Sequence, residues 1–250
     1  SINFSATNAP ACVAGQFIKV AGFATAANNG YFRVVSRTTS KIVLEYGTLV
    51  TEAAGASVTV SPASLLRNGV TKSSMTLEKK FADIGKYHWF KGMVCSQLDL
   101  EIAAGEIFRG TVSFMGQDSA MVSSTVGTGA PTPANANSVY NATSNVGKVF
   151  EGGSVAGAKL KSIRIGLNNN VRGKGKLGSY GHYDVGLGNI LVSGTMMAYF
   201  EDETLYNKFV NQTNSSWAAI FTDSAGNTMI FSMPKIKFSS GRAVAGGANQ

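Results

Sequence analysis

The sequence of 250 residues predicts a mainly β protein. Short runs rich in Val, Ile, Phe and Tyr recur along the chain and are separated by turn residues, which is typical of strands. Two runs between residues 96 and 115 alternate between apolar and polar side chains, as strands with one buried face do. Only residues 201–211 combine helical spacing of apolar residues with acidic residues at the helix start. The length allows one large β domain or two smaller ones with a hydrophobic core.

The first third of the chain is predicted to form a small β module. The strand candidates are 16–20, 31–35, 42–46 and 57–60. Asn28, Asn29 and Gly30 predict a tight turn, because Asn and Gly tolerate the positive φ of hairpin turns. Turn residues near 62–66 then predict a division into a module of residues 1–65 and a domain of residues 66–250.

The clearest hairpin is predicted after a strand at 73–81. In the run 96–102, Leu98, Leu100 and Ile102 share one face. Gln97, Asp99 and Glu101 share the opposite face, and Glu106 lies in the turn. The run 107–115 repeats the alternation, so the hairpin has one face in a core and one facing water.

Residues 116–153 are predicted to form a long loop. They are rich in Ser, Thr, Asn, Ala, Gly and Pro and carry almost no charge, and loops of this length are usually functional or disordered. Strands are expected at 160–167, 190–200 and 229–233. In the helix expected at 201–211, Leu205, Tyr206, Phe209 and Val210 lie on one face.

Composition favours a protein that buries surface against neighbours. Charged residues make up 14%, against roughly 25% in ordinary soluble domains. The net charge of +8 raises the possibility of a polyanionic partner, although dispersed lysines that protect strand edges explain it more simply. Cys12 and Cys95 each have apolar neighbours and make no CxxC, which favours free thiols and a reducing compartment such as a bacterial cytoplasm. No apolar run reaches the length of a membrane helix, so no membrane partner is expected.

Motifs for catalysis, metal binding and phosphate binding are missing from the sequence, so neither an enzyme nor a cofactor is expected. His88 lies among aromatic residues, where a packed histidine is the simpler interpretation. Ser179, His182 and Asp184 crowd into one Gly-rich segment, whereas a catalytic triad is assembled from separate segments. The sequence contains no HExxH, no paired Cys/His spacing, no calcium loop and no GxxxxGK[ST].

Two charged groups are candidates for contacts with partners. A basic run holds Lys159, Lys161, Arg164, Arg172, Lys174 and Lys176. It could contact phosphates, with Tyr180 and Tyr183 available for stacking. The favoured alternative is an exposed edge and turn, solvated or paired to acids of a neighbouring subunit. The acidic face of Gln97, Asp99 and Glu101, with Glu106, is a wet face on a monomer, but repeated around a pore it would repel DNA phosphates.

Several segments resemble phage tail tube proteins of long, non-contractile siphophage tails. The resemblance covers about three quarters of the chain, from residue 67 onward. The segments are RNGVTKSSMTLEKKF at 67–81, LKSIRIGLNNN, VSGTMMAYFEDETLYNKF, a turn with D-x-x-G-N at 223–227, and SMPKIKFSSG. The opening segment GFATAANNGYFRVVS is also similar to sequences of phage structural proteins.

The resemblance implies a tail-tube-type sandwich or barrel of two packed β-sheets flanked by one α-helix. It further implies rings of six copies whose sheets join around a lumen, stacked into a tube by a long inter-ring loop. The implied lumen-facing residues are Gln97, Asp99, Glu101 and Glu106. The inter-ring loop would use Gly127, Pro131, Pro133, Asn137 and Tyr140, and Lys161, Arg164, Arg172, Lys174 and Lys176 are candidates for inter-subunit contacts. The N-terminal module would decorate the outer wall.

The function implied is that of a structural tail tube subunit whose lumen conducts DNA during ejection. The implied partners are copies of the chain itself, a tape-measure protein in the lumen, tail-tip and tail-terminator proteins, and phage DNA in non-specific transit. The chain would reside in the virion and assemble in the host cytoplasm. The alternative is a phage head–tail or decoration protein or a β-sandwich adhesin, which should not polymerise alone.

Overall fold

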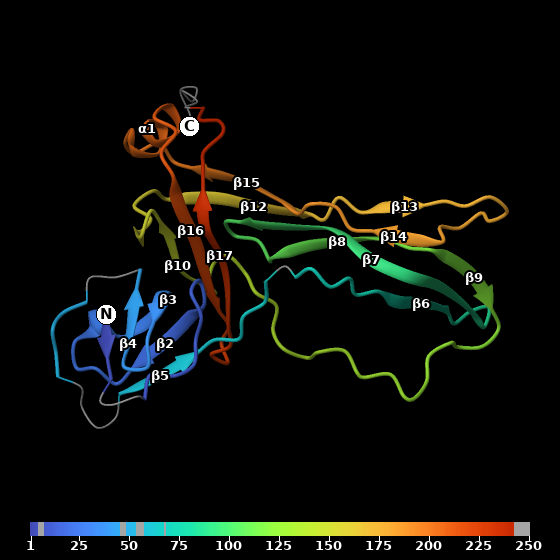
Figure 1. The fold of residues 1–250 in the computed structure, drawn as a ribbon, viewed down its shortest axis with the longest axis horizontal. Coiled ribbons are helices and arrows are strands. Elements are labelled where there is room, and N and C mark those ends of the chain that lie inside the picture. Colours follow the sequence, from blue (N-terminus) through green and yellow to red (C-terminus); the bar gives the residue numbers. More distant parts are fainter. Residues whose placement is uncertain (5–7, 46–48, 54–57, 68, 243–250) are drawn as a thin grey trace. The chain divides into compact units, whose positions relative to one another are not determined.

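A computed structural model describes residues 1–4, 8–45, 49–53, 58–67 and 69–242. The chain divides into two compact units (Figure 1), each of which is built from separated segments. Unit 1 comprises Ser1–Arg67, Ser144–Lys159 and Tyr199–Gln250. Unit 2 comprises Asn68–Thr143 and Leu160–Ala198. Antiparallel strands dominate both units, which confirms the predicted mainly β fold.

The first sheet of unit 1 has five strands in the order β1-β4-β3-β2-β5. Its strands are β1 (Ile2–Asn3), β2 (Phe17–Ala21), β3 (Gly30–Arg37), β4 (Lys41–Leu44) and β5 (Thr59–Pro62), with a 3₁₀ turn η1 (Ala26–Asn28) before β3. Ile18, Val20, Val34 and Ile42 are almost fully buried in one cluster on this sheet. The four predicted strands of the module are therefore confirmed, apart from Tyr46 and Ser57, which lie outside the described residues.

The second sheet of unit 1 has the order β11-β10-β16-β17. Its strands are β10 (Val146–Glu151), β11 (Ser154–Val155), β16 (Ser215–Thr222) and β17 (Thr228–Ile236). Seven of the eight residues of β16 are buried, because the strand is central and apolar residues occupy both of its faces. The turn between β16 and β17 is fixed by Asp223, whose carboxylate accepts hydrogen bonds from the backbone of Ala225 and Asn227.

The two sheets of unit 1 pack face to face. Phe17 of β2 clusters with Phe150 of β10 and with Ala218 and Ile220 of β16. This packing confirms a sandwich of two sheets, and one of the two packed sheets comes from the first 62 residues. The predicted division into a module of residues 1–65 and a domain of residues 66–250 stays a prediction.

Polar contacts also join the two sheets of unit 1, through an ion pair that belongs to the first sheet. Arg33, 2% exposed, pairs with Glu45, to whose Oε2 its Nε donates at 2.7 Å. Ser216 of β16 donates to the Oε1 of the same carboxylate at 3.2 Å. The module is thereby tied to β16 by polar as well as apolar contacts.

Helix α1 (Thr204–Val210) is shorter than the predicted 201–211 and buries none of its residues within the chain. The three acidic residues precede it, and Asp202 accepts a hydrogen bond from the backbone N–H of Thr204 at 2.8 Å. The attachment is polar: Lys208 Nζ lies 2.5 Å from Oε2 of the buried Glu151, whose Oε1 accepts from Ser215 Oγ. The apolar residues of the predicted helix face remain half-exposed or exposed.

Unit 2 is organised around one long strand, β7 (Lys86–Ala103). The C-terminal half of β7 pairs with β8 (Arg109–Met115) on one side and β12 (Leu160–Asn168) on the other, and β12 pairs with β15 (Leu191–Ala198). The N-terminal half pairs with β6 (Met75–Phe81) and β9 (Asp118–Val122), as Figure 1 shows. A ribbon of β13 (Arg172–Lys174) and β14 (Asp184–Gly186) completes the unit.

The predicted hairpin is confirmed, but the predicted loop was wrong in its extent. Residues 116–153 contain β9 and β10, so the chain between strands runs over 123–145. Residues 118–122 are too weakly patterned to stand out, and they form a strand because they pair with the extended N-terminal half of β7. The expected strands at 160–167, 190–200 and 229–233 correspond to β12, β15 and β17.

Candidate assembly surfaces

The polar face of the β8–β7–β12–β15 sheet unites three of the four predicted lumen residues. Gln97, Asp99 and Glu101 alternate along β7, and Gln97 Nε2 donates to Asp99 Oδ2 at 2.7 Å. Glu101 is in register with Arg164 on β12 and with Arg109 on β8. Arg164 Nη2 lies 2.6 Å from Glu101 Oε1, so a predicted inter-subunit arginine pairs within its own chain.

This charge arrangement changes the character of the predicted acidic face. The two carboxylates of β7 are matched by two guanidinium groups on the neighbouring strands. The side chains of Arg164 and Glu101 are 68% and 44% exposed, so their pairing contributes little to stability. The face is polar, and its two carboxylates and two guanidinium groups balance in formal charge. Glu106 lies apart from it at the exposed hairpin turn.

The opposite face of the same sheet is apolar and incompletely covered. Ile102, Ile163 and Ile165 are buried, but Val112 and Val192 toward the two edges are 47% and 45% exposed. In a strand pattern this regular, exposed apolar residues in register indicate a surface that is covered in the assembled state.

Both edges of this sheet are open. Among the described residues, β15 pairs only with β12, and β8 pairs only with β7. An edge strand presents unpaired N–H and C=O groups, which favour pairing with another chain. The four-stranded sheet can therefore extend at either side.

The irregular segment 123–145 is fixed at both ends. At its start, the carboxylate of Glu78 on β6 accepts from Thr125 Oγ1 at 2.8 Å and from the backbone N–H of Val126 at 2.7 Å. At its end, Tyr140 stacks on Phe108 with ring centroids 5.8 Å apart. The candidates Gly127, Pro131, Pro133 and Asn137 lie in the fully exposed stretch between these anchors, whereas Tyr140 is itself an anchor.

The remaining basic candidates do not converge on one site. Lys161, Arg172 and Lys176 are exposed. Lys174 belongs to a clamp in which Asp184 Oδ2 lies 3.0 Å from its Nζ and Oδ1 lies 2.5 Å from Lys72 Nζ. The clamp fixes the β13–β14 ribbon to the segment before β6, which agrees with the interpretation of the basic run as edge and turn.

We expect the Asp184 clamp to persist at acidic pH. The two lysine ammonium groups, Lys72 first, hold the pKa of Asp184 far below its ordinary value. Such a carboxyl binds fewer protons when folded, so its stabilisation is complete above the unfolded pKa of about 3.9 and fades only as the pH falls through the lower folded value. An NMR titration of the side-chain carboxyl should show Asp184 still ionised at the ordinary aspartate pKa of about 3.9. A normal Asp184 titration would contradict the clamp.

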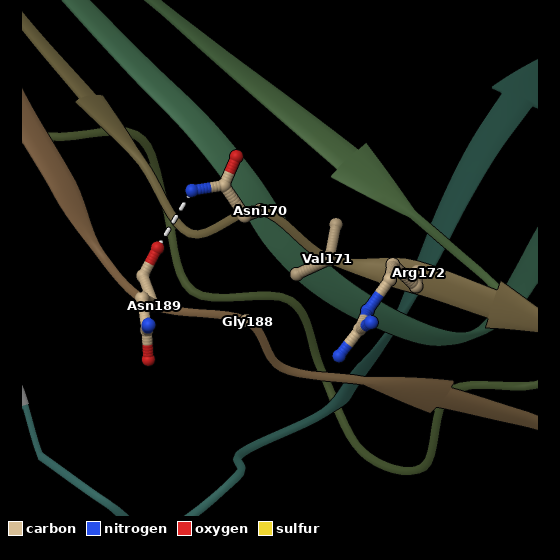
Figure 2. Close-up of a pocket in the computed structure, with 5 residues that line it drawn as sticks. All are labelled: Asn170, Val171, Arg172, Gly188 and Asn189. Atoms are coloured by element: carbon tan, nitrogen blue, oxygen red, sulfur yellow. Dashed lines mark hydrogen bonds between the residues drawn. The ribbon is translucent and has the colours of Figure 1, made fainter.

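A shallow pocket lies where the chain enters and leaves the ribbon, lined by Asn170, Val171, Arg172, Gly188 and Asn189 (Figure 2). Asn170 adopts a positive φ of 45°, and its Nδ2 donates to the carbonyl of Asn189 at 2.7 Å. The two connecting segments pass so closely at Gly188 that a Cβ there would lie 2.4 Å from the carbonyl oxygen of Asn170. The pocket is open, and it marks a backbone crossing.

Replacing Gly188 by Ala should destabilise this crossing by about 1–3 kcal/mol, because the added methyl meets backbone and not a flexible side chain. Urea denaturation of the two proteins would measure the difference. Gly175→Ala is the matched control, since nothing lies within 4 Å of its Cβ position. Equal effects of the two substitutions would show that the crossing is not tight.

The histidines and their neighbours hold structural positions. His88 packs on Phe90 with ring centroids 4.2 Å apart. Ser179 Oγ donates to the carbonyl of Gly181, and the Asp184 carboxylate is taken by the two lysines, so Ser179, His182 and Asp184 do not form a relay. In the described part of the chain, no three His, Cys, Asp or Glu residues come together as a metal site. No helix among the described residues has the length and apolarity to cross a membrane.

A group of basic and aromatic residues at the β6–β7 hairpin was not predicted from the sequence. Lys79, Lys80 and Lys86 lie at the hairpin that joins the two strands. The register places Lys80 on the face of Tyr87 and Trp89, and the other two lysines on the opposite face. Lysines and aromatic residues are mixed over residues 79–91. This composition was the sequence feature from which the group could have been predicted.

These features define a mainly β structural protein with open sheet edges and exposed surfaces suited to assembly. Comparison with family models places the chain more closely: the model described as phage tail tube protein matches residues 23–250. The chain belongs to the phage tail tube protein family, and it is therefore a structural protein of the virion that self-assembles into a tail tube. A search of curated proteins gives no match.

Proposed function

We propose that this chain forms rings of six copies that stack into the tube of a long, non-contractile tail, through whose lumen DNA passes during ejection. The observation that carries the proposal is the family match over residues 23–250. The open edges β8 and β15 support it, because a sheet with two unpaired edges is completed when copies join in a closed ring.

Ring closure is proposed to place β8 of one copy beside β15 of the next. The face of Gln97, Asp99 and Glu101 then lines the lumen, since it is the polar face of the sheet. The near balance of Asp99 and Glu101 by Arg109 and Arg164 leaves no strongly attractive wall for phosphates, which suits non-specific passage. The apolar face with Val112 and Val192 is covered in the assembled tube.

Stacking is proposed to use the exposed stretch 127–139. Its two anchors hold the ends of the stretch on unit 2 and leave the middle free to order on the next ring. The Glu106 turn, Lys161, Arg172 and Lys176 are further exposed positions for contacts between subunits. A tape-measure protein fills the lumen before DNA, tail-tip and tail-terminator proteins close the two ends, and assembly takes place in the host cytoplasm.

Electron microscopy of the purified protein over a concentration series tests this function. Stacked rings or tubes with an open centre are expected. Deleting residues 127–137 should weaken stacking and leave rings, because both anchors of the segment are kept. Unchanged far-ultraviolet circular dichroism would establish that the deletion variant folds. Monodisperse particles of the unmodified chain at every concentration would instead favour a decoration protein or an adhesin.

A further inference from the structure

The hairpin end of β6 and β7 carries a cluster of unneutralised lysines, which we name the lysine arm: Lys79, Lys80 and Lys86 with the turn residue Ile84. All three lysines are exposed, and none takes part in an ion pair with another described residue. Glu78 is occupied by the backbone and hydroxyl of residues 125–126, which leaves Asp83 as the acidic residue of the turn.

The aromatic residues next to the lysine arm are not free to stack on a ligand. Tyr87 and Trp89 are half-buried in the β6–β7–β9 sheet. Lys80 lies over the ring of Tyr87 at 5.8 Å, and Lys79 lies over Phe81 at 4.9 Å. Rings covered in this way do not offer the free stacking platform that single-stranded nucleic acid requires. Ile84 at the tip is 59% exposed and adds an apolar contact to the positive charge.

A surface of opposite charge spans the residues before helix α1 and its first turn. We name it the acidic helix edge: Tyr199, Phe200, Asp202, Glu203 and Tyr206. Phe200 is 66% exposed, and Tyr199 and Tyr206 are also exposed. Glu201 is paired to Lys159, but neither Asp202 nor Glu203 has an ion-pair partner among the described residues, and Asp202 accepts a hydrogen bond from the backbone of Thr204. The edge thus combines free negative charge with exposed aromatic surface.

We propose that the lysine arm of one copy docks on the acidic helix edge of another copy. The two surfaces are complementary in charge, and each adds exposed apolar residues that are buried on contact. Charge complementarity across an interface sets its specificity and raises the rate of encounter. The docking rests on the proposed self-assembly and specifies which surfaces of two copies meet.

Charge reversal tests the docking. The variant Lys79→Glu/Lys80→Glu should raise the protein concentration needed for assembly about tenfold, and Glu203→Lys should act in the same direction. The three substitutions combined in one chain should restore assembly in large part. Lys235→Glu/Lys237→Glu is the matched control, because it makes the same charge change at two exposed lysines, one in β17 and one directly after it. Equal assembly of the arm variant and the control would overturn the docking.

Cross-linking of the unmodified chain tests the docking without relying on the folding of any variant. Copies with and without isotopic label are mixed, assembled and treated with a carbodiimide, which joins lysine ammonium groups to adjacent carboxylates without a spacer. Mass spectrometry should find mixed-label peptides that join Lys79, Lys80 or Lys86 to Asp202 or Glu203. If the chain assembles without such peptides, the docking is wrong while the proposed function stands. If the chain does not assemble, both fall. If the arm variant loses affinity for DNA and assembles normally, the lysine arm serves nucleic acid and the docking is overturned.

Discussion

Replacing Phe221 by Ala is expected to lower the free energy of unfolding of unit 1 by about 3–5 kcal/mol, the range for truncating a large buried aromatic side chain. Phe221 is fully buried in the central strand β16 and meets Phe231 of β17 edge to face, with ring centroids 6.1 Å apart. Its removal leaves a cavity in the middle of a sheet that can close only by moving both neighbouring strands.

Tryptophan fluorescence during urea denaturation measures this effect in the right unit. The chain has two tryptophans, Trp89 in unit 2 and the buried Trp217 in unit 1. A Trp89→Phe background makes the emission report unit 1 alone. Tyr180→Ala is the control, because Tyr180 is fully exposed and surface substitutions change stability by less than about 0.5 kcal/mol. A shift of similar size for both substitutions would mean that β16 is not the centre of the core.

The hairpin of β7 and β8 was predictable because its alternation is a local property. Leu98 and Leu100 on one face, and Asp99 and Glu101 on the other, follow from a period of two and need no knowledge of partners. Such alternation decides the local structure before any long-range contact forms.

The tight turn predicted at Asn28, Asn29 and Gly30 was wrong, because residues 22–29 with the 3₁₀ turn η1 join β2 to β3. Asn29 keeps a φ of −103°, and Gly30, with a φ of 131°, already belongs to β3.

Strand β16 was missed because its pattern is not local. Its residues SSWAAIFT show no alternation, since both faces are covered by other parts of unit 1. A continuous apolar run of this length does not distinguish a buried strand from a buried helix segment. Phe150 and Phe17, which pack with β16, come from segments more than 60 residues away in the sequence.

The candidate surface residues show the same limit. Arg164 was assigned to a neighbouring subunit because sequence gives no register between β12 and β7, and one register places it beside Glu101. Lys174 was likewise free in sequence and bound to Asp184 in the fold. Charged residues find partners through pairing of distant strands, so their availability to another chain is visible only once the register is known.

Replacing Glu151 by Ala is expected to detach helix α1 and to lower the free energy of unfolding of unit 1 by about 3 kcal/mol, as removal of one partner of a buried charged pair does. The Glu151 carboxylate binds Lys208 of the helix through one oxygen and Ser215 of β16 through the other. Because the helix buries none of its own residues, this carboxylate replaces the apolar face that usually anchors a helix. Loss of the carboxylate leaves an ammonium group and a hydroxyl near the core without their acceptor.

Two measurements separate this effect from general weakening. Hydrogen exchange should accelerate at the amides of residues 206–211 in Glu151→Ala and stay unchanged in the centre of β16. Glu203→Ala is the matched control: it removes an acid at the start of the same helix, where no side-chain cap is made, and should cost less than about 1 kcal/mol. Lys208→Met should reproduce most of the loss, and adding Glu151→Met to it should recover part of the stability, because an apolar pair of similar size leaves no buried charge. If the double variant were less stable than either single variant, contacts other than this ion pair would hold the helix. The acidic helix edge would then be held in place for docking by those other contacts.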